Sequence, residues 1–143
     1  LAKALLQPDG YNALSDWWVV ASGLAALAGH IWPIWLGWRG GKAVATGLGM
    51  LLGLAWPVGL ACFGVFLTVI SVSRIVSLSS VLAALSLPLL MLARFASLGE
   101  AVRPAYLSLS IVAAVLVIWR HRSNLSRIAA GTEPRLGDKK KEV

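Results

Sequence analysis

The sequence predicts an all-α protein, a multi-pass bundle of transmembrane helices. Of the 143 residues, 58% are hydrophobic and the mean hydropathy is +0.78, whereas a soluble domain is usually about 45–50% apolar. Four runs, at 17–38, 44–73, 80–93 and 104–119, carry almost no charge. In hydrocarbon every backbone N–H must be satisfied within its own segment, so these runs should be helices. The alternation typical of a membrane barrel is absent.

The first elements precede residue 43. Residues 1–6 are typical of the end of an apolar helix, which the Pro and Gly of segment 7–10 break. Ser15 or Asp16 can cap the next helix, which we expect to start at Trp17 and to pack inside the bundle through its many small residues.

A loop and an ambiguous apolar run follow. Residues 33–42 contain three glycines and two tryptophans, which predicts an irregular loop at the membrane interface before a helix that opens near Ala43. A single helix over 44–73 would be about 45 Å long, although the hydrocarbon core is only about 30 Å thick. The run is therefore either one tilted helix or a hairpin broken at Trp56 and Pro57. We favour the hairpin because Pro57 lacks the N–H that a continuous helix needs.

Charge distribution supports the hairpin. It places ten of the 13 Lys and Arg residues on one side of the membrane and three on the other, as the positive-inside rule requires. With further spans at 79–93 and 104–120, the sequence predicts about five complete spans. We accordingly divide the chain into a transmembrane bundle at 1–120 and a basic cytoplasmic tail at 121–143.

Three polar clusters should lie on the same face of the membrane. The first contains His30, Gly40, Gly41, Lys42 and Thr46. Glycine N–H groups, a helix N-terminus and a lysine charge together suit a phosphate. The alternative is a membrane-surface turn with an incidental lysine.

The second cluster contains Arg74, Ser77, Ser79 and Ser80. Arginine can bind phosphate through two parallel hydrogen bonds, and hydroxyls can complete the binding site. Alternatively, the serines hydrogen-bond to their own helix and Arg74 extends to the interface.

The third cluster contains His121 and Asn124, which can meet on one helical face because they are three residues apart. A histidine can act as acid or base, or donate to phosphate. The alternative is a basic segment that only sets membrane orientation.

Other classes of function receive little support. Two histidines and one cysteine are too few for a convincing metal site, and no cofactor is expected. The net charge of +7 is explained by orientation and by contact with anionic lipid head groups. Nucleic acid is not expected as a partner, because no aromatic residues are interleaved with the basic tail at 139–141.

The clusters resemble three ordered motifs of one family. The run 29–46 resembles the GHxxPxF…GGKGVAT segment of bacterial acyl-phosphate:glycerol-3-phosphate acyltransferases. The serine-rich run with Arg74 is similar to that family's next segment. His121, Asn124 and the stretch 131–134 resemble its HRxN…GTEP segment.

The resemblance implies a seven-helix bundle in the bacterial plasma membrane, with active site and C-terminus cytoplasmic. It implies acyl transfer from acyl phosphate to the sn-1 hydroxyl of glycerol 3-phosphate, giving lysophosphatidic acid for phospholipid synthesis. Membrane lipids would be the other partners. The alternative functions are a polytopic transporter and a structural membrane subunit. The expected site residues are His30, Gly40, Gly41, Lys42 and Thr46 for substrate phosphate, and Arg74, Ser77, Ser79, Ser80, His121 and Asn124 for catalysis.

Two departures from the family pattern stand out. Alanine occupies position 43, where the family usually has glycine, and its Cβ predicts ordinary helical dihedrals there. The family's first segment, GSGNxGxTN, has no counterpart in the sequence. We therefore expect the chain to lack that N-terminal segment.

Overall fold

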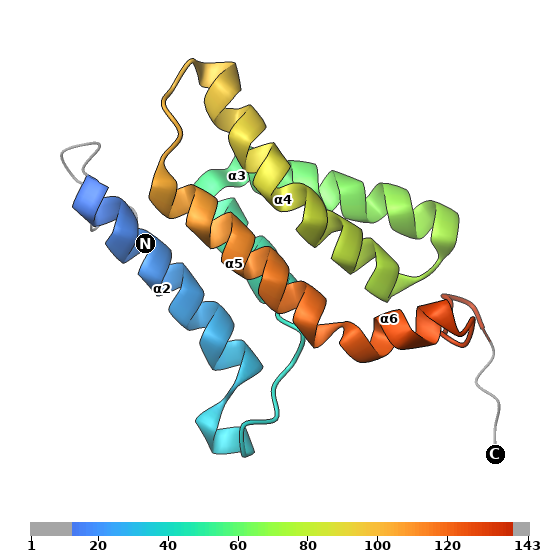
Figure 1. The fold of residues 1–143 in the computed structure, drawn as a ribbon. Coiled ribbons are helices and arrows are strands. Elements are labelled where there is room, and N and C mark those ends of the chain that lie inside the picture. Colours follow the sequence, from blue (N-terminus) through green and yellow to red (C-terminus); the bar gives the residue numbers. More distant parts are fainter. Residues whose placement is uncertain (1–12, 139–143) are drawn as a thin grey trace.

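The computed structural model describes residues 13–138, which form helices and connecting loops (Figure 1). The all-α prediction is confirmed for these residues, whereas the helix end expected at 1–6 lies outside them. The elements are α2 (Ala13–Ile31), the 3₁₀ turn η1 (Ile34–Leu36), α3 (Val44–Ser73), α4 (Val76–Leu98), α5 (Pro104–Arg120) and α6 (Arg122–Ala129).

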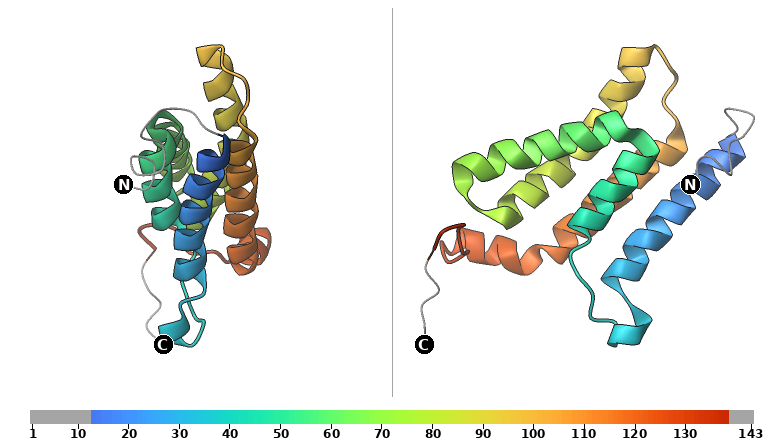
Figure 2. Two further views of the ribbon diagram at one scale, coloured as in Figure 1. Left: turned by 90° about the vertical axis from the view of Figure 1, so that its left-hand side faces the viewer. Right: turned by 180° about the vertical axis from the view of Figure 1, so that it is seen from behind.

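Helix α3 is broken near its middle. Ala55 has φ −149° and ψ 69°, far from helical values, and Pro57 follows. Proline cannot donate to the carbonyl of Gly53, and its ring clashes with that carbonyl in a straight helix. After the break the second arm turns back, so the two arms form a V (Figure 2). The break that the hairpin interpretation predicts is therefore present.

The number of spans differs from the prediction. The described residues contain three helices long and apolar enough to cross a membrane, or four if α5 and α6, bent by 58°, count as one span. Five complete spans are not supported. The difference lies in α3, because its first arm, 44–54, is well short of the about 20 residues that a span needs, although its second arm, 56–73, falls within the usual range of about 17–25. Its 30 residues count as one candidate.

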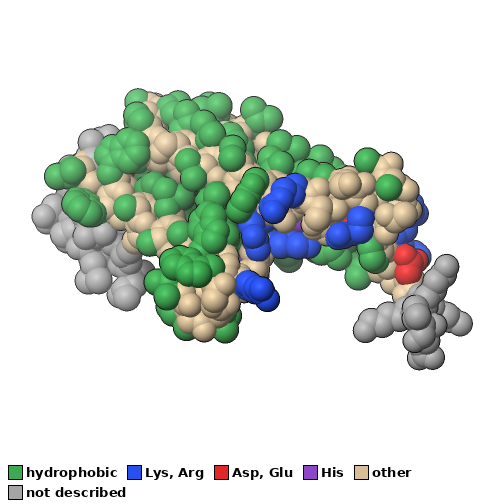
Figure 3. All heavy atoms as spheres, turned by 60° about the horizontal axis from the view of Figure 1, so that its bottom comes forward, with side chains coloured by type: hydrophobic (Ala, Val, Ile, Leu, Met, Phe, Trp, Pro, Cys, Tyr) green, Lys and Arg blue, Asp and Glu red, His purple; other side chains and the backbone are tan. Residues whose placement is uncertain are grey.

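The bundle has two distinct ends. The loop 37–43, the α3–α4 turn and the α5–α6 junction lie together at what we call the basic end. There the Leu136 N–H donates to the Arg74 carbonyl at 2.7 Å, and Arg120 Nη2 donates to the Gly40 carbonyl at 2.8 Å. Figure 3 shows basic side chains gathered between the apolar body and the α6 arm. The start of α2, the bend of α3 and the α4–α5 loop form the far end.

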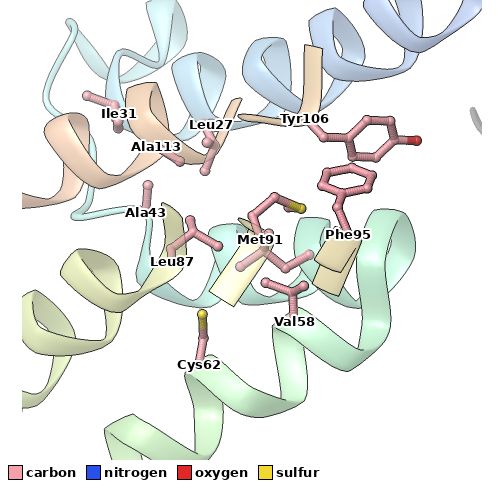
Figure 4. Close-up of a cluster of buried hydrophobic side chains, with 11 residues drawn as sticks. Leu27, Ile31, Ala43, Val58, Cys62, Leu87, Met91, Phe95, Tyr106 and Ala113 are labelled. Atoms are coloured by element: carbon pink, nitrogen blue, oxygen red, sulfur yellow. The ribbon is translucent and has the colours of Figure 1, made fainter. Parts of the chain in front are cut away.

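The core lies where α3, α4 and α5 meet (Figure 4). Leu87 and Met91 of α4 are buried there against Leu27 of α2, Val58 of α3 and Ala113 of α5. Many large apolar side chains on the outer faces are exposed. Such a continuous apolar surface is unusual for a soluble monomer and suits contact with lipid.

Gly40 allows the loop 37–43 to pack against the end of α2. A Cβ atom at this position would collide with the backbone carbonyl groups of His30 and Ile31. Backbone cannot move away as a flexible side chain can, so only glycine fits there.

We expect Gly40→Ala to destabilise the protein by about 3 kcal/mol, the upper range for overpacking. Gly49→Ala is the matched control, because a Cβ there meets nothing within 4 Å and alanine is favoured over glycine in a helix by about 0.5–1 kcal/mol. Thermal unfolding in detergent measures both. Equal unfolding midpoints for the two variants would contradict the packing argument.

Candidate active site

One cavity of about 580 Å³ opens between the two arms of α3, helix α4 and the α5–α6 junction. Its polar wall lies at the basic end and its apolar wall lies in the V of α3. The polar wall is formed by Lys42, Ser77, Ser80, His121, Asn124, Arg127 and Glu133. The apolar wall includes Leu48, Leu51, Cys62, Phe66 and Leu87.

Ala43 shapes the entry into α3 in a way that the sequence did not predict. It has φ 58° and ψ 18°, in the left-handed region, so the expectation of helical dihedrals is wrong. A left-handed alanine costs about 1–2 kcal/mol, but Ala43 is only 1% exposed and its methyl group packs in the core. A left-handed residue before the helical Val44 turns successive N–H groups toward one concavity, which favours an anion. Lys42 lines the cavity beside it.

Arg120 fixes the loop 37–43 through two hydrogen bonds to its backbone. Its Nε donates to the Gly41 carbonyl at 3.1 Å and its Nη2 to the Gly40 carbonyl at 2.8 Å. The Gly41 N–H donates to the His30 carbonyl at 3.2 Å. These hydrogen bonds fix the backbone of the two glycines and so position Lys42, the next residue. We did not predict Arg120 as a site residue, because a basic residue at a helix end also satisfies the positive-inside rule.

Glu133 is the centre of the polar wall, but it was not among the predicted site residues, although the stretch 131–134 that contains it was singled out. Its Oε1 accepts from Ser77 Oγ and from Asn124 Nδ2, both at 2.6 Å, and its Oε2 accepts from Arg127 Nε at 2.7 Å. The Glu133 side chain is only 7% exposed. The available signals were an acidic residue among the arginines of the basic tail and its place in the stretch 131–134, which resembles a family motif. Burial raises the pKa of Glu133, but the hydrogen bonds from Asn124, Ser77 and Arg127 outweigh burial and hold the pKa below its ordinary value.

Asn124 and His121 both offer acceptors. Because a carboxylate only accepts, the Asn124 amide turns its NH₂ toward Glu133, and its Oδ1 is buried without a hydrogen-bond partner. His121 Nδ1 lies 2.7 Å from the Val117 carbonyl. Since that carbonyl only accepts, Nδ1 carries the proton and Nε2 of the neutral ring is an acceptor. Both residues line the cavity, so the site presents acceptors for a ligand that bears hydroxyl groups.

The serine cluster divides in two. Ser77 and Ser80 line the cavity, whereas Ser79 is buried and donates to the Ile75 carbonyl at 2.9 Å. Arg74 is exposed at the basic end in a left-handed conformation, φ 58°. The structure thus brings five predicted residues to the cavity: Lys42, Ser77, Ser80, His121 and Asn124. Six others lie outside its lining: His30, Gly40, Gly41, Thr46, Arg74 and Ser79.

The family follows from sequence comparison. A family model described as glycerol-3-phosphate acyltransferase matches residues 1–131. The chain belongs to the glycerol-3-phosphate acyltransferase family. This confirms the resemblance seen in the three motifs. Together with its candidate spans, membership makes the chain a multi-pass integral membrane protein.

Relatives support the assignment. The chain is 73% identical to a glycerol-3-phosphate acyltransferase of Prochlorococcus marinus (strain MIT 9313) over 124 residues, 87% of this chain and 59% of that protein. It is 66% identical to one of Synechococcus sp. (strain CC9902), over 98% of this chain and 66% of that protein. The chain therefore spans roughly three-fifths to two-thirds of the length of these relatives.

The fold also has solved counterparts. The chain is similar to the crystal structure of PlsY (YgiH), an integral membrane glycerol 3-phosphate acyltransferase, in its glycerol 3-phosphate form. The TM-score is 0.78 and the identity 36%, over 85% of this chain and 57% of that one. The lysophosphatidic acid form of PlsY gives the same TM-score and identity.

We expect Glu133→Gln to lower the free energy of unfolding by about 2 kcal/mol at pH 7, because hydrogen bonds to a charged group contribute about 1.5–3 kcal/mol. The folded-state pKa of Glu133 is depressed from its ordinary value of 4.5. The stabilisation is therefore present above pH 4.5 and lost as the pH falls through the folded-state pKa.

The difference in stability between wild type and Glu133→Gln should accordingly shrink on acidification, as measured by thermal unfolding across pH. Glu100→Gln is the control, because Glu100 is exposed and its ion pair with Arg103 is 3.7 Å long, a kind that contributes little. A pH-independent difference for Glu133→Gln would refute the assigned role of its charge.

Proposed function

We propose that the cavity carries out acyl transfer from acyl phosphate to the sn-1 hydroxyl of glycerol 3-phosphate, forming lysophosphatidic acid. One observation supports this most directly. A single cavity joins the cations Lys42 and Arg127 and the acceptors of His121 and Asn124 to a long apolar wall. The substrates have these features, namely phosphate, hydroxyls and a fatty chain. The names of the relatives agree with the proposal.

Phosphate binding is assigned to the entry of α3. The first N–H groups of a helix have no partner within it, and the helix dipole adds positive potential. Lys42 supplies a full charge beside them. Gly40 and Gly41, with His30 packed against Gly41, position this loop. We assign the acyl phosphate to Ser77 and Ser80, which line the cavity, together with the exposed Arg74, which lies just before the start of α4.

The acyl chain fits the V of α3. Leu48 and Leu51 face the cavity from the first arm, and Cys62 and Phe66 face it from the second. Leu51 and Cys62 are nearest the bend along their arms, so they define the closed end of this apolar wall. Burial of each methylene contributes about 0.8 kcal/mol, which gives the wall a means to select chain length.

The reaction needs positioning more than a strong nucleophile, because an acyl phosphate is already activated. The sn-1 oxygen attacks the acyl carbonyl carbon, and the bond from that carbon to the phosphate oxygen breaks. Asn124 Oδ1 and His121 Nε2 accept from the glycerol hydroxyls and orient them. A phosphate oxygen takes the hydroxyl proton as inorganic phosphate leaves. Lys42 and Arg74 stabilise the charge that develops.

The orientation proposed for the membrane follows from charge. The basic end should face the cytoplasm of the bacterial plasma membrane, since that end carries the excess of Lys and Arg. The substrates would then reach the cavity from the cytoplasm. Transport remains the competing function for a bundle with a broken helix.

The proposal is tested by mixing the whole purified protein with acyl phosphate and labelled glycerol 3-phosphate. We expect labelled lysophosphatidic acid together with stoichiometric phosphate. Lys42→Ala and Asn124→Ala should lower kcat/KM roughly 100-fold through loss of positioning. Ser123→Ala, an exposed neighbour of Asn124 outside the cavity lining, should stay within about twofold.

Arg74→Ala in the same assay tests the acyl phosphate assignment, with a large loss of kcat expected. Near-normal rates for both Lys42→Ala and Arg74→Ala would eliminate the proposal of two anion sites. Accumulation of labelled substrate in vesicles without any product would favour transport instead.

Cys62→Phe should shorten the acyl chains that the site accepts, because the larger ring fills the closed end of the V. We expect kcat/KM to fall roughly tenfold more for an 18-carbon than for a 12-carbon acyl phosphate, as for a pocket that rejects one or two methylenes. Leu60→Phe, exposed and outside the cavity lining, is the matched control. Equal losses for both chain lengths in Cys62→Phe would disprove the assignment of the acyl wall.

A further inference from the structure

A second cavity, of about 280 Å³, lies at the far end of the bundle. The bend of α3, the last turns of α4, and the loop and first turn that lead into α5 form its walls. It shares no lining residue with the candidate active site. The family assignment and the acyl transfer reaction do not use it.

Two polar atoms of its lining residues have no hydrogen-bond partner. They are Arg94 Nη1 and Tyr106 Oη, and both are shielded from bulk solvent. Tyr106 is only 4% exposed, and its hydroxyl points away from the cluster of buried hydrophobic side chains in Figure 4. Buried polar groups in proteins nearly always have partners. A guanidinium only donates and a phenol can donate, so these two atoms need an acceptor that the described residues do not provide.

The charges around the cavity favour an anionic acceptor. Arg103 lies 3.7 Å from Asp16 and 3.7 Å from Glu100, so its charge is already compensated. Arg94 has no ion pair with a carboxylate among residues 13–138. The cavity therefore keeps one uncompensated positive charge, in a setting where water screens it poorly. Guanidinium groups bind phosphate and carboxylate oxygens with particular strength.

The surroundings indicate a lipid as the source of that anion. Trp56, which lines the cavity, is 64% exposed, and tryptophan favours the level of the lipid head groups. Leu98 also lines the cavity and is exposed beside it. The cavity thus combines a partly buried cation with an apolar rim at the far end of the candidate spans, and phospholipid head groups lie at the ends of membrane spans.

We propose that the far-end cavity binds the phosphate of a phospholipid head group, with Arg94 and Tyr106 donating to its oxygens. The lipid's acyl chains extend along the exposed apolar side chains at the rim. The site is distinct from the candidate active site and lies at the opposite end of the same helices.

The test uses the whole protein purified in an uncharged glycoside detergent. Dihexanoyl-phosphatidylglycerol and, separately, inorganic phosphate are titrated while thermal unfolding is followed. We expect the lipid to raise the midpoint saturably. Arg94→Gln and Tyr106→Phe should each weaken the apparent affinity about tenfold, the effect of losing one charge-assisted hydrogen bond. Arg135→Gln, which changes an exposed arginine at the basic end, and Lys42→Ala should both retain wild-type affinity.

Each other outcome has a definite meaning. If inorganic phosphate alone reproduces the same shift and the same dependence on Arg94 and Tyr106, the cavity is a free-phosphate site and the lipid assignment is overturned. Unchanged lipid affinity in Arg94→Gln and Tyr106→Phe overturns the site altogether. An equal loss in Arg135→Gln or Lys42→Ala does the same, because it assigns binding to general charge or to the active site. If Arg94→Gln does not fold, Tyr106→Phe, which removes one oxygen, decides alone.

Discussion

The arrangement of the whole bundle depends on the break in α3. Pro57 cannot complete the helix, and Ala55 leaves helical dihedrals just before it. The chain therefore returns to the end from which it came, which brings Lys42 and Ser77 to one cavity although 34 residues separate them in sequence. An unbroken helix would carry them to opposite ends. The same bend creates the V for an acyl chain, and its outer side lines the far-end cavity.

The C-terminal segment supplies the rest of the polar wall of the cavity that the break in α3 makes possible. Glu133 connects the start of α4, α6 and the segment that follows α6 through three short hydrogen bonds. A carboxylate that holds Ser77 and the Asn124 amide leaves only particular atoms available to a ligand, notably Asn124 Oδ1. Glu133 thus determines which polar atoms the cavity offers to a ligand, although the proposed mechanism gives Glu133 no contact with the substrates. The division of the chain at residue 120 stays a prediction, but residues 121–134 contribute to the same cavity as the spans.

The features that were predicted correctly from the sequence have local causes. A missing N–H at Pro57 predicts a break wherever it occurs, and apolar runs free of charge predict helices. The features that were missed depend on contacts between distant residues. Ser77 and Glu133 are 56 residues apart, so no spacing or periodicity indicates their bond. The hydrogen bond from Arg120 to the Gly40 carbonyl likewise joins two residues that are 80 positions apart in the sequence. Ala43 was mispredicted because packing around a buried methyl group overrides its backbone preference. More spans were predicted than the structure contains because the first half of α3 is apolar enough, yet too short, to cross.

Three non-glycine residues among those described, Trp38, Ala43 and Arg74, have left-handed backbones, and all three lie at the basic end. Valine, isoleucine or threonine in such a conformation would be a severe outlier. The range of substitutions that the basic end tolerates is therefore narrower than the exposure of its residues suggests, even at the exposed Arg74. Variation during evolution or in an engineered library should be restricted here to glycine, asparagine and a few unbranched residues, while the lipid-facing helices accept almost any apolar side chain.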